Sequence, residues 1–550
     1  MKKAFMYLLL LGPLSGSAQQ PTDTLIHAMD AIFEPYSKNS GPGCAVAVVK
    51  NGQVIFSKGY GMANLEYDIP ITAATIFDIA SVSKQFTGLA VSMLIEQGKI
   101  SLDDDIHKYL PDIPRFDRTI TIQQLLHHIS GIRDWPQTLH AAGWRWDEVF
   151  SFEDIMRMVK YQVDLDFEPG SQYSYSNTGY NLLAAVVEKV TKQRFREWTD
   201  SAIFTALGMR SSHFRDDPAK IIKNLAYSYT PGVNGFANIP GELTAYGSSS
   251  LFTSVDDLSK WVIHFQQQVT AKNPVYLRML TAGTLNNGDK VPYGFGLGLG
   301  EDRGLKTISH TGGWAGYRTI ITNYPDEQLS IIILSNAADF DPTGYAQKVA
   351  DLLLKGKFRI TNKTPENLSK LPNVQVDSSL LKKYAGSYQL GPGWIVTLTL
   401  ENGRLMTQAN GEDKFPTEAK SDSVFWIDAY GASMTFVQDP GGHVDLLKYK
   451  SILAKRITPV AHDPATYPGF RGVYYSKELA TEYVVDTAGN KLFMHHMRLG
   501  NFELLPDLSD SDQFSGEIGS IKFFKNEKGE LSGFKLSGGR IKNIRFDKRQ

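Results

Sequence analysis

A polar segment with two prolines, residues 361–377, divides the 550-residue chain into two parts of different character. Prolines within a polar run favour a linker over a helix or a strand. Strand patterns and long helical patterns alternate before this segment, whereas short strand-like runs separated by turns such as Asn402-Gly403 follow it. A chain of this length is too long to fold around a single hydrophobic core, so we expect several domains. We therefore expect a mixed domain over residues 22–360, a linker, and an all-β region.

The part before the linker carries two groups of strand patterns with helical patterns around them. Hydrophobic spacing predicts a helix over residues 25–36, followed by a hairpin with a turn at Asn51-Gly52. Strand patterns return after a helix-rich region of about 72–290. The predicted strands are residues 44–50, 53–58, 307–310, 317–323 and 329–334, and a closing helix is predicted at 345–354. This order predicts an α+β domain, in which helices flank an antiparallel sheet and an all-helical subdomain is inserted between its strands.

The part after the linker repeats loosely. Gly386-Ser387-Tyr388 recurs as Gly472-Val473-Tyr474, and the turn that includes Asn402-Gly403 has a counterpart at Gly489-Asn490. A repeat of this length is typical of tandem domains and is too long for a solenoid. Short alternating strands in each copy predict two small antiparallel β-barrels, over residues 378–460 and 467–550.

The N-terminus has the pattern of an export signal. Lys2 and Lys3 precede an apolar run at residues 4–11, and the small residues Gly16-Ser17-Ala18 follow it. This pattern predicts a cleavable secretory signal peptide over residues 1–18, which is too short for a membrane span. We therefore expect a periplasmic or secreted protein.

Charge and cysteine content narrow the possible partners. A formal net charge of −1 gives no large field that would attract nucleic acid or an anionic membrane. Cys44 is the only cysteine, so the chain has no internal disulfide and no thiolate metal cage. His495-His496 has no carboxylate or further histidine at ligand spacing. We expect neither a metal nor a cofactor.

Ser81 begins a Ser-x-x-Lys motif at the start of a long apolar helical pattern. The apolar positions continue to Gly98, so Lys84 is expected to lie on the same helix face as Ser81. A lysine of lowered pKa can take the proton from a serine hydroxyl, as acyl transfer through a serine ester requires. Two other matches, at residues 379–382 and 532–535, start no long helix. The alternative role for Ser81 is to cap the helix.

Two further motifs carry groups that suit the same chemistry. Tyr175 and Asn177 form a Tyr-x-Asn motif before another apolar helical pattern. A phenol beside a lysine can shuttle a proton, and an amide can hold a substrate carbonyl or orient the lysine. His310 opens a His-x-Gly motif at a strand end, where it could bind a carboxylate or relay protons. Gly312 and Gly313 would let a substrate backbone approach the strand edge. The alternative for the Tyr-x-Asn motif taken alone is a polar turn that ends at a helix start. The alternative for His310 taken alone is a structural histidine.

Ser-x-x-Lys, Tyr-x-Asn and a strand-borne His-x-Gly, in this order, resemble the motifs of the penicillin-recognising serine hydrolases. This group includes class C β-lactamases, DD-carboxypeptidases, D-aminopeptidases and related esterases. Further segments extend the resemblance over about residues 30–355, namely residues 125–131, 206–209, 247–251 and 293–296. The resemblance implies a β-lactamase-like catalytic domain, and the tandem lipocalin-like barrels are similar to those of a D-aminopeptidase.

The resemblance also implies roles for individual residues. The catalytic residues are Ser81, Lys84 and Tyr175, and the substrate-binding residues are Asn177, His310, Gly312 and Gly313. Ser81 is the nucleophile, Lys84 assists its deprotonation and Tyr175 is the proton shuttle. The N–H groups of Ser81 and Gly313 would form the oxyanion hole. The tryptophans Trp135, Trp144 and Trp146 are candidates either for the cleft wall or for core packing.

His310 departs from the pattern of β-lactamases, in which lysine commonly opens the third motif. The motif therefore lacks a fixed cation for a β-lactam carboxylate, and the Lys-x-Gly at residues 50–52 lies in a predicted hairpin turn. The expected function is a serine hydrolase that forms an acyl-enzyme and acts on peptides containing D-amino acids. An esterase or a β-lactamase using the same serine is the alternative. A non-catalytic penicillin- or muropeptide-binding protein is the alternative from another class.

Overall fold

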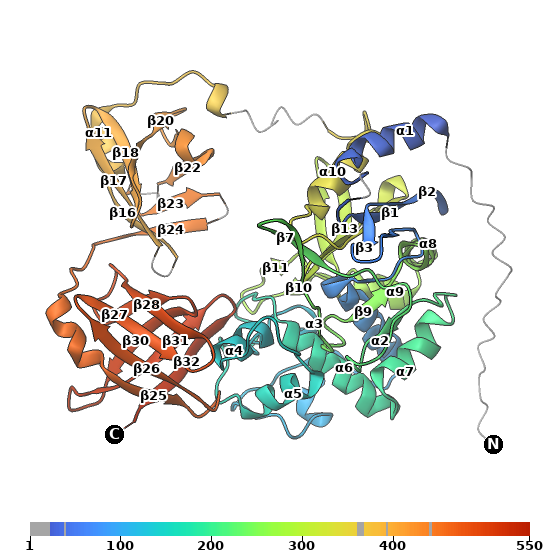
Figure 1. The fold of residues 1–550 in the computed structure, drawn as a ribbon, viewed down its shortest axis with the longest axis horizontal. Coiled ribbons are helices and arrows are strands. Elements are labelled where there is room, and N and C mark those ends of the chain that lie inside the picture. The colour runs from blue at the N-terminus through green and yellow to red at the C-terminus, as the bar shows by residue number, and fades with distance from the viewer. Residues whose placement is uncertain are drawn as a thin grey trace.

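The computed structural model describes residues 22–37, 40–359, 368–391, 394–438, 443–450 and 452–549. The predicted signal peptide lies outside these residues, as does part of the predicted linker. Figure 1 shows three bodies, a large mixed domain formed by the first part of the chain and two β-barrels that follow it. None of the helices within the described ranges has the length and apolar character that a membrane span requires.

The large domain is built on a six-stranded antiparallel sheet in the order β12-β13-β14-β15-β1-β2. Its strands are β1 (Cys44–Lys50), β2 (Gln53–Tyr60), β12 (Gly298–Asp302), β13 (Leu305–Trp314), β14 (Tyr317–Tyr324) and β15 (Leu329–Ser335). The early and late strands of the domain meet at the centre, where Val46 of β1 pairs with Ile333 of β15. The expected α+β sheet, completed by strands from both ends of the domain, is confirmed.

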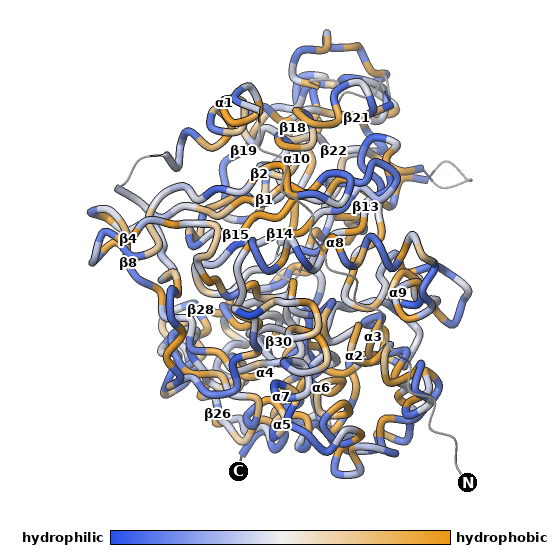
Figure 2. The backbone as a smooth tube through the Cα atoms, turned by 90° about the vertical axis from the view of Figure 1, so that its right-hand side faces the viewer, coloured by the Kyte–Doolittle hydropathy of each residue, from blue (hydrophilic) through white to orange (hydrophobic). Residues whose placement is uncertain are grey.

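Strand β1 is apolar along most of its length because both of its faces are covered. One face belongs to the core beneath the terminal helices α1 (Asp23–Ile32) and α10 (Pro342–Leu353), and the other to the main core, which includes α8 (Val255–Thr270). The side chains of the first face are Cys44, Val46 and Val48, and those of the second are Ala45, Ala47 and Val49. The same hydrophobic character runs through β1, β14 and β15 at the centre of Figure 2.

The insert between β2 and β12 is rich in helices. They are α2 (Lys84–Glu96), α3 (Ile122–Leu126), α4 (Trp135–Ala141), α5 (Phe152–Tyr161), α6 (Asn177–Thr191), α7 (Phe195–Thr199), α8 and α9 (Pro274–Met279). The insert also holds short strands, which the expected all-helical subdomain did not include. They are β3 (Met62–Asn64), β4 (Ile69–Pro70), β5 (Phe77–Asp78), β6 (His213–Phe214), β7 (Tyr229–Gly232), β8 (Gly235–Asn238), β9 (Leu251–Thr253), β10 (Gly283–Thr284) and β11 (Lys290–Val291). Segments of two to four residues are too short to show an alternating pattern.

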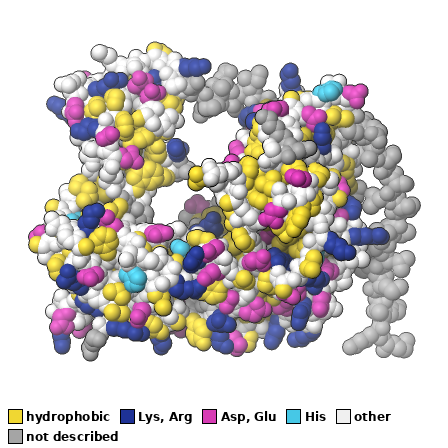
Figure 3. Space-filling view, in the orientation of Figure 1, with side chains coloured by type: hydrophobic (Ala, Val, Ile, Leu, Met, Phe, Trp, Pro, Cys, Tyr) yellow, Lys and Arg dark blue, Asp and Glu magenta, His cyan; other side chains and the backbone are white. Residues whose placement is uncertain are grey.

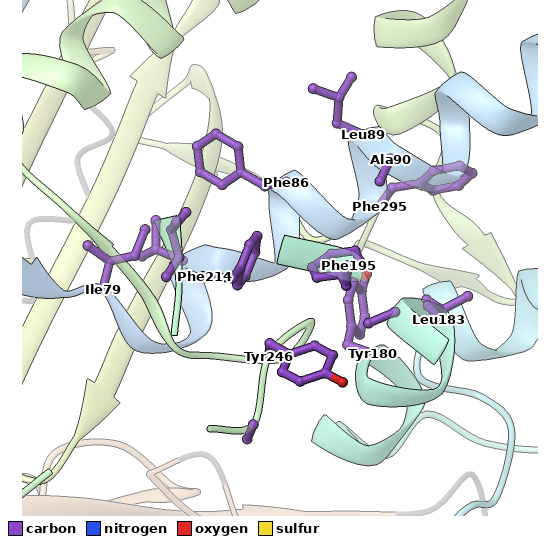
Figure 4. Close-up of a cluster of buried hydrophobic side chains, with 14 of the residues drawn as sticks. Ile79, Phe86, Leu89, Ala90, Tyr180, Leu183, Phe195, Phe214, Tyr246 and Phe295 are labelled. Atoms are coloured by element: carbon purple, nitrogen blue, oxygen red, sulfur yellow. The ribbon is translucent and has the colours of Figure 1, made fainter. Parts of the chain in front are cut away.

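Helix α2 lies at the centre of the main core and packs against α6 (Figure 4). Phe86, Leu89 and Ala90 of α2 and Tyr180 and Leu183 of α6 are all at most 1% exposed. The ring centroid of Phe86 lies 4.8 Å from that of Trp261 in α8, a distance typical of packed aromatic pairs. The start of α2, where the Ser-x-x-Lys motif ends at Lys84, is therefore held by the packing of the main core.

The first barrel is a nine-stranded antiparallel sheet in the order β19-β18-β17-β16-β24-β23-β22-β21-β20, and helix α11 (Ser378–Tyr384) precedes it. Its strands are β16 (Gly386–Gly391), β17 (Trp394–Glu401), β18 (Arg404–Ala409), β19 (Lys414–Pro416), β20 (Glu418–Ala419), β21 (Val424–Ile427), β22 (Ala432–Val437), β23 (Leu446–Tyr449) and β24 (Ile452–Ile457). The consecutive strands β19 and β20 form its two ends, so the sheet curls into a nearly closed barrel.

The second barrel is closed and runs from β25 to β32. Its strands are β25 (Gly472–Ser476), β26 (Thr481–Ala488), β27 (Lys491–His496), β28 (Gly500–Pro506), β29 (Gln513–Gly516), β30 (Gly519–Lys525), β31 (Leu531–Gly538) and β32 (Ile541–Lys548). The expected two antiparallel barrels are confirmed.

The sequence repeat has the same structural role in both barrels. The Tyr388 hydroxyl donates to the Tyr384 carbonyl at 3.0 Å, and the Tyr474 hydroxyl donates to the Phe470 carbonyl at 2.6 Å. Both tyrosines are fully buried, and each hydrogen bond spans four residues. The repeated Gly-x-Tyr therefore ties the first strand of each barrel to the segment before it.

The barrels differ in their relation to the large domain. In Figure 3 an opening separates the first barrel from the large domain, whereas the second barrel lies directly against it. Lysine, arginine and carboxylate side chains are interspersed over the face shown there. The side-chain contacts between the second barrel and the large domain reach the candidate active site.

Candidate active site

Ser81 lies in a short 3₁₀ turn, Ala80–Ser83, between β5 and α2. The sequence predicted a helix from Ser81 onward, but the α-helix begins only at Lys84. Side chains three residues apart are eclipsed in a 3₁₀ turn, so Ser81 and Lys84 still share one side. The turn is fixed by Ala80, whose φ of +48° is left-handed and whose N–H donates to Asp78 Oδ1 at 2.8 Å. Such strain in a non-glycine residue is typical of functional sites.

Lys84 is buried and surrounded by oxygen atoms. Its Nζ lies 3.1 Å from Ser81 Oγ, 2.7 Å from Asn177 Oδ1 and 2.7 Å from the Ser248 carbonyl oxygen. Burial lowers the pKa of Lys84 well below its ordinary value, and Arg540 acts in the same direction, whereas Asp134 opposes it. A neutral amine has two N–H groups and one lone pair. In the neutral form, the two carbonyl oxygens can accept the two N–H groups, which leaves the lone pair for the Ser81 hydroxyl.

Asn177 is oriented by Asp134, a residue that the sequence analysis did not select. The backbone N–H and the Nδ2 amide of Asn177 donate to Asp134 Oδ1 at 2.7 and 3.0 Å, which turns Oδ1 of the amide toward Lys84. Asp134 is fully buried, and burial raises the pKa of its carboxyl, while Arg540 and Asn177 lower it. In the sequence, Asp134 precedes Trp135-Pro136, a helix start with proline in its first turn, so it would have been taken for a cap.

Tyr175 lies over the same group of residues. Its ring centroid is 4.9 Å from Lys84 Nζ and 4.7 Å from the guanidinium carbon of Arg540. Burial raises the pKa of the Tyr175 phenol, and a hydrogen bond with Ser81 lowers it. The buried His128 ring packs 4.2 Å from the Tyr175 ring, and its Nδ1 accepts from the Ser176 N–H at 3.1 Å. His128 therefore braces the loop that carries Tyr175.

His310 lies on β13 beyond the end of its neighbour β12. The pairing of β12 with β13 stops at Ser309, so residues 310–314 leave one strand edge unpaired with β12. His310 Nδ1 lies 2.6 Å from the Thr311 carbonyl oxygen, and Nε2 lies 2.9 Å from the Tyr293 hydroxyl. Burial and the nearby Lys84 lower the pKa of His310 to about 3. His310 is therefore neutral at neutral pH and supplies no fixed charge.

Glycine at position 312 lets β13 approach the 3₁₀ turn that carries Ser81. A Cβ atom there would lie 2.3 Å from the Ile79 carbonyl oxygen and 2.3 Å from Thr319 Oγ1, so a side chain would push the strand away. Because of this close approach, Gly313 and the 3₁₀ turn line one cleft. Six of the seven predicted site residues come together directly at or around Ser81, and Gly312 forms the strand contact behind them.

The cleft has a volume of about 520 Å³. Its aromatic walls include Trp135, Trp314 and Tyr175. Of the three tryptophans named from the sequence, Trp135 lines the cleft and is 2% exposed, Trp144 packs against the main core, and Trp146 is 50% exposed. The complete lining is Ser81, Trp135, Pro136, Gln137, Tyr175, Asn177, Leu243, Ser249, His310, Thr311, Gly313, Trp314 and Arg540.

Arg540 comes from the second barrel, in the turn between β31 and β32. Its Nη1 donates to Asp134 Oδ2 at 3.0 Å, across 406 positions of the sequence. No motif in the sequence marks this arginine, since it lies in a polar hairpin turn of a repeated barrel. Only the docking of the barrel brings it to the cleft.

A buried ionic cluster holds the second barrel in place, and we call it the Arg133 cluster. It consists of Arg133, Asp166, Glu478 and Lys542. Arg133 pairs with Glu478 of the barrel at 2.7 Å and also with Asp166, and it donates to the backbone carbonyl of Lys542. The Lys542 N–H donates to Asp166 at 2.7 Å. The side chains of Arg133, Asp166 and Glu478 are at most 4% exposed.

His496 also lies at this interface. Its Nε2 lies 2.8 Å from Thr481 Oγ1, and its Nδ1 accepts from backbone N–H groups, including that of Leu499 at 3.3 Å. A Cβ on Gly143 of the large domain would lie 2.1 Å from the His496 ring, so the glycine allows the barrel to approach. His496 therefore has a packing role in the contact between the two domains.

Comparison with known proteins identifies the class to which this fold and site belong. The Beta-lactamase family model matches residues 29–354, so the chain belongs to the beta-lactamase family of serine hydrolases. Penicillin-binding protein 4* of Bacillus subtilis (strain 168) is 28% identical over 428 residues, which cover 74% of this chain and 93% of that protein. A D-aminopeptidase of Brucella anthropi is 26% identical over 536 residues, which cover 92% of this chain and 96% of that protein.

A solved structure shares the fold over most of the chain. The octameric penicillin-binding protein homologue from Pyrococcus abyssi superposes with a TM-score of 0.56 at 22% identity, covering 87% of this chain and 99% of that one. The expected relationship to penicillin-recognising serine hydrolases is confirmed.

Proposed function

We propose that this protein is a serine hydrolase that forms an acyl-enzyme on Ser81 and cleaves peptides or amides containing D-amino acids. The observation that carries the proposal is the environment of Lys84, whose Nζ lies 3.1 Å from Ser81 Oγ and contacts two carbonyl oxygens, and whose burial lowers its pKa and so favours the neutral amine. A lysine in this state is a general base for serine. A helix-capping role for Ser81 would not require a buried lysine beside its hydroxyl.

In the proposed reaction, Lys84 takes the proton of the Ser81 hydroxyl as Oγ attacks the substrate carbonyl carbon. The carbonyl oxygen becomes an oxyanion, which the N–H groups of Ser81 and Gly313 would stabilise by about 3 kcal/mol each. The bond to the leaving group then breaks, and the proton passes from Lys84 through Tyr175 to the departing nitrogen or oxygen. Water completes the cycle by hydrolysing the ester, with its proton taken by the same groups.

The charges favour Lys84 over Tyr175 as the base for acylation. Burial moves the pKa of both groups toward the neutral form, which makes the lysine a proton acceptor and leaves the phenol protonated. A protonated phenol in contact with Ser81 is suited to donate a proton to the leaving group. We therefore assign to Tyr175 the transfer of the proton to the leaving group.

Two relatives support a D-peptide substrate, because one is a D-aminopeptidase and the other a penicillin-binding protein. An esterase or a β-lactamase would use the same serine and the same proton route, so a panel of D-aminoacyl anilides, D-Ala-D-Ala peptides, short-chain esters and penicillins separates these activities. Cleavage of L-configured substrates alone would exclude the D-peptide proposal. Stable penicillin labelling without turnover of any substrate would favour a binding protein instead.

Labelling by an uncharged fluorophosphonate tests the nucleophile. We expect the probe to label the wild-type protein on Ser81 and the Ser81→Ala variant to show no labelling. Ser379→Ala is the matched control, because Ser379 opens a second Ser-x-x-Lys match in the exposed start of α11 and should leave labelling unchanged. Labelling that persists in Ser81→Ala would remove Ser81 as the nucleophile.

The pH dependence of acylation tests the role of Lys84. Because the pKa of Lys84 is lowered, kcat/KM should rise with pH along a limb well below the range of an exposed lysine. Asp134 raises this pKa, so Asp134→Asn should move the limb to lower pH. An unchanged limb, or a shift to higher pH, would contradict the assignment of this limb to Lys84.

We also propose that the chain is exported through its N-terminal signal and acts in the periplasm or outside the cell. The two lysines, apolar run and small residues of the first 18 positions support this proposal. Mass spectrometry of the protein recovered from the cell envelope or medium should give a mature N-terminus close to residue 19. An intact N-terminus on protein recovered from the cytoplasm would contradict it.

A further inference from the structure

The cleft has one charged side chain in its lining, and that side chain comes from the second barrel. Of the lining residues within the described part of the chain, only Arg540 carries a formal charge at its surface, since His310 is held neutral. The ionisable side chains of Lys84 and Asp134, which lie nearby, are 0% exposed. A substrate group in the cleft therefore meets a guanidinium as its nearest accessible charge.

Arg540 has donors left for a ligand. A guanidinium carries five N–H donors, and the described structure records one hydrogen bond for Arg540, from Nη1 to Asp134. The Arg540 side chain is 42% exposed, whereas Asp134 is fully buried and already accepts three hydrogen bonds from Asn177. The planar fork of donors matches a carboxylate, which arginine binds with two parallel hydrogen bonds.

The position of Arg540 is fixed before any substrate binds. The Arg133 cluster holds the backbone of Lys542 on both its N–H and carbonyl sides, two residues from Arg540. On the other side, Gly539 has a φ of +56° and lies against Gln137 of the large domain. A preorganised cation loses little entropy on binding an anion, which increases affinity and specificity.

The side of the cleft that Arg540 occupies indicates which part of the substrate it meets. Its guanidinium carbon lies 4.7 Å from the ring centroid of Tyr175, the residue proposed to protonate the leaving group. An anion paired with Arg540 would therefore belong to the leaving group. An ammonium group at the same place would be repelled by the guanidinium.

We propose that Arg540 binds a free carboxylate on the leaving group, so that the protein releases a C-terminal amino acid from its substrate. The inference rests on the proposed hydrolase function and names its substrate class. The second barrel thereby supplies the fixed cation that the third motif lacks, because His310 stands where a lysine would stand. Cleavage transfers the acyl group to Ser81, and the leaving amino acid departs with its amine protonated and its carboxylate paired with Arg540.

Two peptides that differ in a single group test this assignment. N-acetylated D-Ala-D-Ala with a free carboxylate and its C-terminal amide share the same scissile bond. We expect wild-type protein to prefer the free carboxylate in kcat/KM, and Arg540→Met to reduce this preference by about 10- to 100-fold, as the loss of a charge-assisted hydrogen bond predicts. Any effect of the variant on Lys84 would change kcat/KM equally for both peptides. The ratio of the two kcat/KM values therefore reports only the recognition of the carboxylate. An unchanged ratio would overturn the inference.

Matched variants and a second measurement complete the experiment. Lys535→Met removes an exposed cation from strand β31 of the same hairpin and should leave the ratio unchanged. Arg540→Lys keeps the charge without the planar fork, so it should retain part of the preference. If neither peptide is turned over, the degree to which each peptide protects Ser81 from labelling by the fluorophosphonate measures its binding instead. Equal protection by the two peptides, or no protection by either, would overturn the assignment of Arg540. Failure of wild-type Ser81 to react with the probe would instead refute the hydrolase proposal itself.

Discussion

The Lys84→Met variant is expected to lose acylation activity by about 10²- to 10⁴-fold in kcat/KM, the range that a general base contributes. Lys84 Nζ is a buried amine that lies 3.1 Å from Ser81 Oγ, and methionine fills a similar volume without a lone pair or a charge. The rate of fluorophosphonate labelling and of ester hydrolysis would measure the loss. The pH limb assigned to Lys84 should disappear from the residual activity.

Lys99→Met is the matched control for this variant. Lys99 follows the same helix α2 but is exposed at its far end, so its replacement should leave kcat/KM unchanged. Circular dichroism and thermal unfolding would establish that Lys84→Met still folds. Acylation within tenfold of wild type would exclude Lys84 as the base and leave Tyr175 as the alternative proton acceptor.

The Arg133→Met variant is expected to destabilise the docking of the second barrel by about 3–5 kcal/mol, because it leaves Asp166 and Glu478 buried without their partner. Burial already raises the pKa of Asp166 to about 6 and raises that of Glu478. The Arg133 guanidinium opposes this effect, so its removal should raise the pKa values of both carboxyl groups further. Calorimetry should show a lower unfolding temperature, and limited proteolysis should cleave the segment between the barrels more rapidly.

Arg145→Met is the matched control for the barrel contact. Arg145 pairs with Asp147 at 2.6 Å, but both side chains are more than half exposed, so this pair should contribute at most about 1 kcal/mol. If Arg133→Met had no larger effect than Arg145→Met, the Arg133 cluster would not be what holds the barrel. If it does undock the barrel, the preference for a free carboxylate should fall as in Arg540→Met, since Arg540 then leaves the cleft.

Much of the fold followed from local patterns in the sequence. The strands β1, β14 and β15 are long apolar runs bounded by turns, and the Gly-x-Tyr repeat marked both barrels. The short strands of the insert could not be predicted in the same way, because pairs such as β5 and β9 are defined by contacts between distant segments. The 3₁₀ turn at Ser81 was also missed, since its geometry depends on the left-handed Ala80 and its bond to Asp78.

The candidate site likewise contains residues that the sequence predicted and a residue that it did not. Ser81, Lys84, Tyr175 and Asn177 were named from short motifs, because the chemistry requires those groups at those spacings. Asp134 had no such signal, since an aspartate before a helix is expected to be a cap. Its role depends on hydrogen bonds to Asn177 and Arg540, which come from other elements of the structure.

The sequence by itself determined the family, the Ser-x-x-Lys motif and the tandem barrels, because each is encoded in residues that are close together in the chain. The tertiary structure alone decided the charge of the cleft. His310 is neutral because its surroundings bury it, and the accessible cation is Arg540, which the Arg133 cluster brings from a barrel more than 400 positions beyond its partner Asp134. Electrostatics depends on distance and burial in space, and neither can be measured along a sequence.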